Sequence, residues 1–149
     1  MKYMLPLLLI LLAVSSCKKD EEKQAEKDET IITQYISDNG LNATATGSGL
    51  YYIIDSQGGG ASCNSNSTVV VAYSGYFTNG DVFDESLISG IEFNLQGVIS
   101  GWTEGIPYFK EGGVGRLLIP SALAYGESGS GSVPGNSVLI FDVTLIDVL

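Results

Sequence analysis

The sequence predicts an α+β domain in which a twisted antiparallel β-sheet wraps around one short α-helix. Runs of β-branched and aromatic residues, separated by turn signals, recur from about residue 48 to the C-terminus. Among them lies one helix-like segment that contains the only tryptophan, Trp102, and ends before Gly112-Gly113. A large aromatic side chain in the first turn of such a helix gives a small sheet an apolar body to pack around.

Six strands are expected from these patterns, at residues 50–55, 68–77, 81–84, 91–95, 116–119 and 137–148. Asn79-Gly80, between the second and third of them, is typical of a tight hairpin turn. In the last run the apolar residues alternate, which is typical of a strand with one buried face; they are Leu139, Phe141, Val143 and Leu145.

The single helix is expected to begin at Trp102 or Thr103 and to end near Phe109. Pro107 lies inside it. A proline in the first turn removes no N–H that needs an intrahelical acceptor, whereas a proline further along the helix is destabilising. We therefore expect a helix of about two turns.

Residues 1–16 are expected to be a signal peptide. Lys2 provides a basic start, and Met4 to Val14 is an apolar run of 11 residues, shorter than the roughly 20 residues that span a bilayer. The segment Val14-Ser15-Ser16-Cys17 resembles a bacterial lipobox. That resemblance implies cleavage before Cys17, with lipid on its thiol and on the new amino end. An ordinary secretory peptide that happens to contain a cysteine is the alternative.

Residues 17–47 are expected to form a lipidated, charged tether with a short helix and a linker. Residues 18–29 are densely charged without apolar periodicity, which is typical of a solvated tether; their start also resembles the acidic sorting tag of surface lipoproteins. Residues 42–49 are small and polar and indicate a linker. The domain itself is expected to occupy residues 48–149.

A short amphipathic helix of about ten residues is expected within this tether. Its apolar stripe is Ile31, Ile32, Tyr35 and Ile36. Asp28 or Thr30 is the candidate N-cap, and Asn39-Gly40 is the candidate stop. This helix would dock on the domain or on a partner chain, so the oligomeric state is left open.

Charge and composition limit the function classes. The 149-residue chain has a net charge of −10 and no histidine. From Asp38 onward, eleven acidic residues face only Lys110 and Arg116, so nucleic acid is not an expected partner. Without histidine there is no Ser-His-Asp triad and no His-ligated metal. No cofactor or metal is expected.

Six short motifs then appear in a fixed order. They are A-Y-S-G at 72–75, N-G-D-V-F-D at 79–84, V-I-S-G-W-T-E-G at 98–105, I-P-S-A-L-A-Y-G at 119–126, V-P-G-N at 133–136 and L-I-F-D-V at 139–143. Each motif is weak alone. Together, at this spacing, they are similar to the FKBP-type peptidyl-prolyl cis-trans isomerases, over nearly all of residues 50–149.

The resemblance implies a proline-binding pocket with Trp102 as its floor. Tyr73, Asp84 and Tyr125 would be the catalytic residues: Tyr125 would donate to a substrate carbonyl, and Asp84 would orient Tyr73 or polarise the prolyl amide. The implied substrate-binding residues are Trp102 at the floor, Phe83 and Phe141 in the walls beside Tyr73, and Ile91, Val98, Ile99 and Val133 around the rim. The Ile99 N–H is a further candidate donor. Plain core packing remains the alternative for Trp102 and Phe141, and a turn or capping role for Asp84.

Three features depart from the family pattern. Ile91 stands where many members have an aromatic residue, which predicts a smaller wall. Ser128 to Ser132 replace a more apolar flap, and Gly135 stands where a second proline is common. A more polar and more flexible flap would weaken turnover and the binding of macrolide inhibitors that the resemblance implies.

The expected function is therefore that of a lipid-anchored peptidyl-prolyl isomerase. It would act outside the cytoplasm, at a bacterial membrane, on proline-containing polypeptides. A non-catalytic chaperone or peptide-binding lipoprotein that uses the same pocket is the alternative. A surface lipoprotein with a structural or capture role is a third possibility.

Overall fold

The computed structural model describes the backbone of residues 5–149 and the side chains of residues 16–149. The signal peptide expected at residues 1–16 therefore lies almost wholly outside the described side chains. Cys17, the expected lipidation site, is exposed. Within the described residues, no helix combines the length and the apolar character needed to cross a bilayer.

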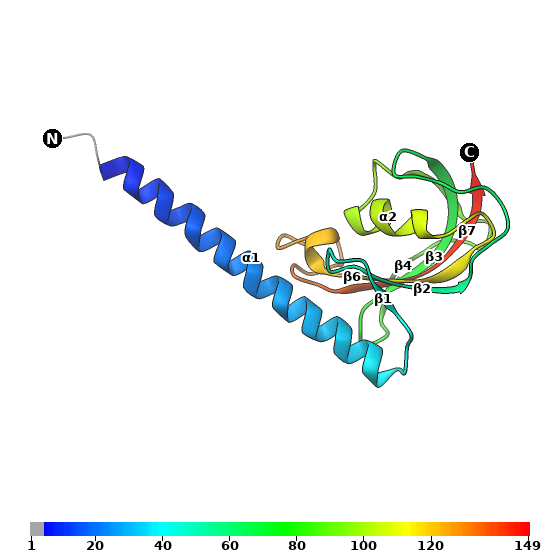
Figure 1. The fold of residues 1–149 in the computed structure, drawn as a ribbon, viewed down its shortest axis with the longest axis horizontal. Coiled ribbons are helices and arrows are strands. Elements are labelled where there is room, and N and C mark those ends of the chain that lie inside the picture. Colours follow the sequence, from blue (N-terminus) through cyan, green and yellow to red (C-terminus); the bar gives the residue numbers. More distant parts are fainter. Residues whose placement is uncertain (1–4) are drawn as a thin grey trace.

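Seven strands of the described chain form one antiparallel sheet (Figure 1). The strand order is β1-β2-β6-β7-β3-β4, and β5 pairs with β3 outside this path. The expected antiparallel sheet around a short helix is confirmed, and each expected strand is present within two residues of its predicted ends. The strands are β1 (Thr44–Ala45), β2 (Tyr51–Ser56), β3 (Thr68–Tyr76), β4 (Val82–Glu85), β5 (Ile91–Asn94), β6 (Val114–Ile119) and β7 (Leu139–Val148).

Strand β3 connects the two parts of the sheet that matter for function. One edge of β3 pairs with β7 along nearly its whole length. Its other edge pairs first with β5, where Val69 lies opposite Phe93, and then with β4, where Gly75 lies opposite Asp84. Tyr73 of β3 therefore lies between the residues that β5 and β4 contribute.

Helix α2 (Ser100–Gly105) lies against one face of the sheet and continues as the 3₁₀ helix η1 (Ile106–Tyr108) (Figure 1). It begins two residues before the expected start because Gly101 serves close packing and does not interrupt the helix. A Cβ atom on Gly101 would lie 2.5 Å from Ile119, and one on Gly105 would lie 2.7 Å from Leu117. Pro107 falls in the first turn of η1, where the helix type changes.

Helix α1 (Leu5–Asp38) replaces the expected charged tether, so the prediction of a short helix of about ten residues is wrong. The charged run continues the helix because lysine, glutamate and glutamine are good helix formers, and an exposed helix needs no apolar periodicity. The stop is as expected: α1 ends at Asp38, and Gly40 follows with φ +60°.

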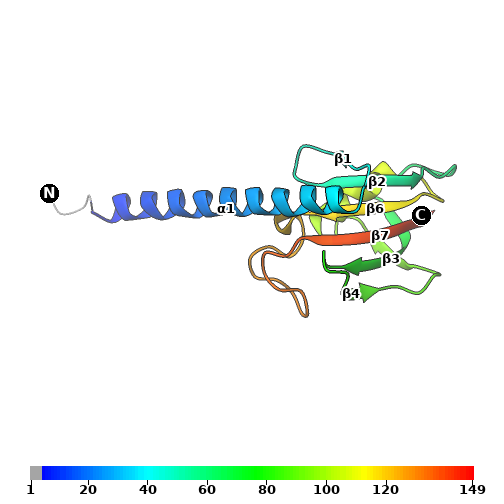
Figure 2. The same ribbon diagram turned by 90° about the horizontal axis from the view of Figure 1, so that it is seen from below.

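The C-terminal part of α1 docks on the domain's own sheet (Figures 1 and 2). Ile32 is fully buried and packs with Leu118 of β6 and Val138. Leu118 alternates along β6 with Leu117 and Ile119, which face α2, so the two helices cover opposite faces of the strand. Figure 2 shows the N-terminal part of α1 extending well beyond the sheet.

Two further expectations about residues 17–47 are wrong. Asp28 and Thr30, the candidate N-caps, lie inside α1, and Asp28 is buried there. Thr44–Ala45, in the expected linker, form β1 and pair with β2, so the sheet begins before residue 48. Sequence patterns miss both because the partners of these residues lie elsewhere in the chain.

Candidate active site

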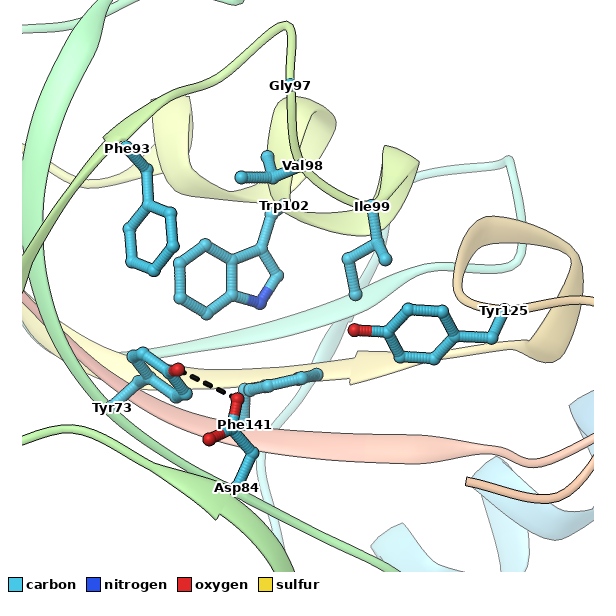
Figure 3. Close-up of a pocket in the computed structure, with 9 residues that line it drawn as sticks. All are labelled: Tyr73, Asp84, Phe93, Gly97, Val98, Ile99, Trp102, Tyr125 and Phe141. Carbon is cyan, nitrogen blue, oxygen red and sulfur yellow. Dashed lines mark hydrogen bonds between the residues drawn. The ribbon is translucent and has the colours of Figure 1, made fainter. Parts of the chain in front are cut away.

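A pocket of about 430 Å³ opens between α2 and the sheet (Figure 3). Trp102 of α2 forms its floor. Strands β3, β5 and β7 contribute a ring each, and the loops before α2 and after β6 complete the mouth. Its lining residues are Tyr73, Asp84, Phe93, Gly97, Val98, Ile99, Trp102, Tyr125 and Phe141.

Three aromatic rings from three strands hold the indole of Trp102. Tyr73, Phe93 and Phe141 meet it edge to face, with ring centroids 5.1, 5.2 and 5.4 Å away and interplanar angles of 86°, 76° and 82°. Aromatic pairs prefer this arrangement because the positive edge of one ring meets the negative face of the other. The floor of the pocket is therefore fixed in orientation as well as in position.

The indole N–H of Trp102 is buried and has no hydrogen-bond partner among the described residues. A buried donor left unpaired costs about 1–3 kcal/mol. In Figure 3 the nitrogen edge faces the space between Ile99, Tyr125 and Phe141. The floor thus presents a polar atom to the pocket interior as well as an apolar face.

A hydrogen bond joins the side chains of Tyr73 and Asp84. The Tyr73 hydroxyl donates to Asp84 Oδ2 at 2.8 Å (Figure 3). Burial, and then the hydrogen bond and negative charge of Asp84, raise the pKa of Tyr73 to about 12. Asp84 lies within β4 and bonds a pocket residue, which argues against the turn or capping role. The pair fixes the Tyr73 ring and places a carboxylate at the wall of the pocket.

Two donors at the mouth of the pocket have no acceptor within residues 16–149. The first is the hydroxyl of Tyr125, which is 38% exposed and points into the pocket toward Ile99 and Trp102 in Figure 3. The second is the backbone N–H of Ile99, the residue that caps the start of α2. The Tyr125 hydroxyl is therefore free to donate to a ligand carbonyl that enters the pocket.

The structure leaves Phe83, one of the expected wall residues, outside the lining. Phe83 packs edge-on against Phe141, with centroids 5.5 Å apart at 88°, and also contacts Phe77. Gly75 makes room for this contact, because a Cβ atom there would lie 2.7 Å from both Phe83 and Phe141. Phe83 therefore supports the wall and does not form it.

Ile91, expected at the rim, also lies outside the lining and is 43% exposed. Phe93 follows two residues later on β5 and so points to the same side of the strand. Phe93 provides the aromatic wall that the sequence lacks at Ile91. The alternation of residues along residues 91–95 could have identified it.

Val133 is buried in the main core and does not line the pocket, which corrects its expected place at the rim. It is drawn inward by a tight turn in which Ser130 and Val133 exchange two backbone hydrogen bonds of 2.9 Å. Close packing explains why glycine stands at position 135, since a Cβ atom there would lie 1.9 Å from the Glu127 carbonyl oxygen. The Gly/Ser flap is thus a hydrogen-bonded turn.

The fold and the pocket define a small α+β domain that offers an apolar, ring-lined site to a compact ligand. Comparison with known proteins gives the same class. Residues 59–146 match the family described as FKBP-type peptidyl-prolyl cis-trans isomerase. The chain therefore belongs to this family.

Individual relatives agree. The chain is 43% identical over 141 residues to a probable FKBP-type peptidyl-prolyl cis-trans isomerase of Haemophilus influenzae, covering 93% of this chain and 58% of that protein. It is 38% identical over 138 residues to FkpA of Escherichia coli, covering 91% and 50%. The crystal structure of Escherichia coli FkpA superposes with a TM-score of 0.74 at 35% identity, covering 99% of this chain and 73% of that one. The chain thus spans about half the length of these curated relatives.

Proposed function

We propose that this domain accelerates cis-trans rotation about X-Pro peptide bonds in polypeptides. The observation that carries the proposal is the pocket itself: its floor and walls are aromatic, it opens to solvent, and the hydroxyl of Tyr125 lies at its mouth as a free hydrogen-bond donor. A prolyl ring fits such a site, and no metal, cofactor or nucleophile is required for the reaction.

The chemistry follows from the nature of the barrier. Rotation about the bond costs about 18–20 kcal/mol because it breaks amide resonance, and unaided prolyl isomerisation takes about 10–100 s. The planar amide is more charge-separated than the twisted one, so an environment without water favours the twisted form. Millisecond turnover requires an acceleration of about 10⁴–10⁵, or roughly 5.5–7 kcal/mol of transition-state stabilisation.

Each residue of the pocket contributes to this stabilisation according to its position. Trp102 packs under the prolyl ring, and Phe93, Phe141 and Val98 exclude water around it. Tyr125 and the Ile99 N–H donate hydrogen bonds to a substrate carbonyl. Asp84 orients Tyr73 through their hydrogen bond. The negative charge of the Asp84 carboxylate also polarises the prolyl amide as the amide twists.

A combined binding and turnover experiment tests the proposal. Quenching of Trp102 fluorescence reports binding of a short Ala-Pro peptide, because the indole is the only tryptophan and forms the floor. A protease-coupled assay reports isomerisation of the same peptide. We expect both signals from the unmodified protein. Isomerisation no faster than in buffer contradicts catalysis.

Binding without turnover would support the second candidate, a non-catalytic chaperone or peptide-binding lipoprotein. The observation that favours it is the polar Ser128–Ser132 turn, which replaces the more apolar flap of the family and is joined to Tyr125 by a hydrogen bond from the Gly129 N–H to the Tyr125 carbonyl oxygen.

Macrolide inhibitors would bind the same pocket, and this turn is expected to weaken their affinity. Competition between a macrolide and the peptide for Trp102 quenching measures that effect.

The natural substrates we propose are proline-containing segments of proteins that fold outside the cytoplasm. Support comes from the lipobox-like Val14-Ser15-Ser16-Cys17 and from the exposure of Cys17. Lipid on Cys17 would anchor the chain to a bacterial membrane, at its periplasmic or cell-surface face. Asp28, which docks on the domain, lies eleven positions after Cys17 in the same helix, which would hold the domain about 16 Å from the anchor.

Cell fractionation tests the anchor. The protein is expected in the membrane fraction, and Cys17→Ser should release it, with Cys63→Ser as the matched control that leaves fractionation unchanged. A Cys17→Ser protein that stays with the membrane contradicts lipidation. Protease treatment of intact cells separates the cell-surface face, and with it a capture role, from the periplasmic face.

A further inference from the structure

We infer that helix α1 holds the catalytic Tyr125 in place through Asp28, which makes Asp28 a positioning residue. Asp28 and Ser121 are the polar side chains buried in the described part of the chain, with exposures of 1% and 3%. They lie 93 residues apart in sequence and are in direct contact. Asp28 thus joins α1 to the segment that carries Tyr125. The kinetic part of this inference rests on the proposed function.

Both oxygens of the Asp28 carboxylate accept hydrogen bonds. Its Oδ2 accepts from the Ser121 backbone N–H at 2.8 Å and from the Ser121 hydroxyl at 2.5 Å. Its Oδ1 accepts from Gln24 Nε2 at 2.8 Å, one helical turn earlier. A carboxylate is costly to bury without such partners. Their number and geometry indicate that this contact fixes one specific arrangement of α1 against the domain.

Ser121 passes this constraint to Tyr125. Ser121 opens the 3₁₀ helix η2 (Ser121–Leu123), and its carbonyl oxygen accepts hydrogen bonds from the N–H groups of Ala124 at 3.0 Å and Gly126 at 2.8 Å. These two residues flank Tyr125. The backbone on both sides of Tyr125 is therefore tied to one residue, and that residue is tied to α1.

The link is separate from what holds the sheet together. The Asp28 side chain makes no hydrogen bond to a strand residue. Ile32, one helical turn later in α1, packs against Leu118 independently of Asp28. Removing the Asp28 carboxylate leaves the buried N–H and hydroxyl of Ser121 without an acceptor, which favours rearrangement of η2. Tyr125, which is 38% exposed and follows η2, is then no longer held with its hydroxyl pointing into the pocket.

Kinetics on the full chain test the link. Asp28→Ala should lower kcat/KM about 2- to 10-fold, the range expected for one hydrogen bond to substrate. Asp28→Asn should lose less, because an amide oxygen in the Oδ2 position can still accept both bonds from Ser121. Glu26→Gln removes the same charge from an exposed position on the same helix and should leave kcat/KM unchanged.

A double mutant separates positioning from general loss of structure. In a Tyr125→Phe protein the hydroxyl is already absent, so adding Asp28→Ala should cost nothing further. An Asp28→Ala loss as large in the Tyr125→Phe background as in the unmodified protein overturns the inference.

Hydrogen exchange provides a readout that needs no catalysis. In Asp28→Ala, the Ala124 and Gly126 amides should exchange faster, while amides in the β3–β7 ladder keep their rates. Unchanged exchange at both residues overturns the link. If the unmodified protein shows no turnover, the proposed function fails, and this exchange measurement decides the inference alone.

Discussion

Replacing Asp84 by leucine separates a catalytic carboxylate from a structural one. Asp84 is exposed and makes one side-chain hydrogen bond, which it accepts from Tyr73 at 2.8 Å. Tyr73 is only half-buried, so without Asp84 its hydroxyl can turn to water. The free energy of unfolding should therefore fall by no more than about 1 kcal/mol. The rate should fall more, by roughly tenfold, which corresponds to about 1.4 kcal/mol of lost transition-state stabilisation.

The matched control is Glu85→Leu. Glu85 is the next residue on β4, is exposed and carries the same charge, but its side chain points to the opposite face of the strand. It should keep both rate and stability. Tyr73→Phe removes the same hydrogen bond from its other side, so equal losses in Tyr73→Phe, Asp84→Leu and the double mutant identify orientation of Tyr73 as the role of Asp84.

Denaturant unfolding and the protease-coupled rate, measured on the same samples, decide the outcome. If Asp84→Leu unfolds the domain or lowers its stability by several kcal/mol, the carboxylate is structural and the reasoning fails. If rate and stability both stay at the level of Glu85→Leu, Asp84 has no part in the reaction.

Three more predictions follow from packing and ionisation. Trp102→Leu removes the ring on which Tyr73, Phe93 and Phe141 converge, so thermal denaturation should show a loss of about 2–4 kcal/mol; unchanged stability would mean that the rings do not depend on the indole. Gly101→Ala places a Cβ atom 2.5 Å from Ile119 and should cost about 1–3 kcal/mol in the same measurement, whereas Gly59→Ala, with open space around its Cβ and no positive φ, should cost less. Because the pKa of Tyr73 is raised to about 12, its contribution to stability is complete below pH 10 and is lost as pH rises from 10 through 12. Denaturant unfolding at these pH values should show that loss, and the Tyr73→Phe protein should lack this component.

Local signals in the sequence were sufficient for most of the sheet. The alternation of Leu139, Phe141, Val143 and Leu145 places the buried face of β7 correctly, since all four are buried. The Asn79-Gly80 turn forms as expected, with φ +92° at Gly80 and a hydrogen bond from the Phe77 N–H to the Asp81 carbonyl oxygen. Turn chemistry and strand periodicity depend on neighbouring residues, so they can be read without knowledge of the fold.

The pocket was predicted less completely. Seven of the expected site residues line it: Tyr73, Asp84, Val98, Ile99, Trp102, Tyr125 and Phe141. Phe93 was missed because the family motif points to Ile91, two residues earlier on the same side of β5. The alternation along residues 91–95 carries the signal, but only the pairing of β5 with β3 shows which of the two residues lines the pocket. Phe83 packs behind the lining residue Phe141, and Val133 lies in the main core; only side-chain packing decides this difference.

Helix α1 shows the limit of sequence patterns most clearly. Its charged run has no apolar periodicity, and Asp28 resembles a helix cap when only its neighbours are considered. The residue that explains Asp28 is Ser121, 93 positions away. A buried carboxylate is recognisable only once its partners are in place.

The central claim is that the Trp102 pocket lowers the barrier to rotation about a prolyl bond. Two-dimensional NMR exchange spectroscopy on a short Ala-Pro peptide, with a catalytic amount of the full chain, measures that rotation directly and needs no coupled protease. We expect exchange cross-peaks between the cis and trans forms within a mixing time of about one second, at which the peptide alone shows none. A peptide that broadens Trp102-pocket resonances yet exchanges at its unassisted rate would contradict the claim.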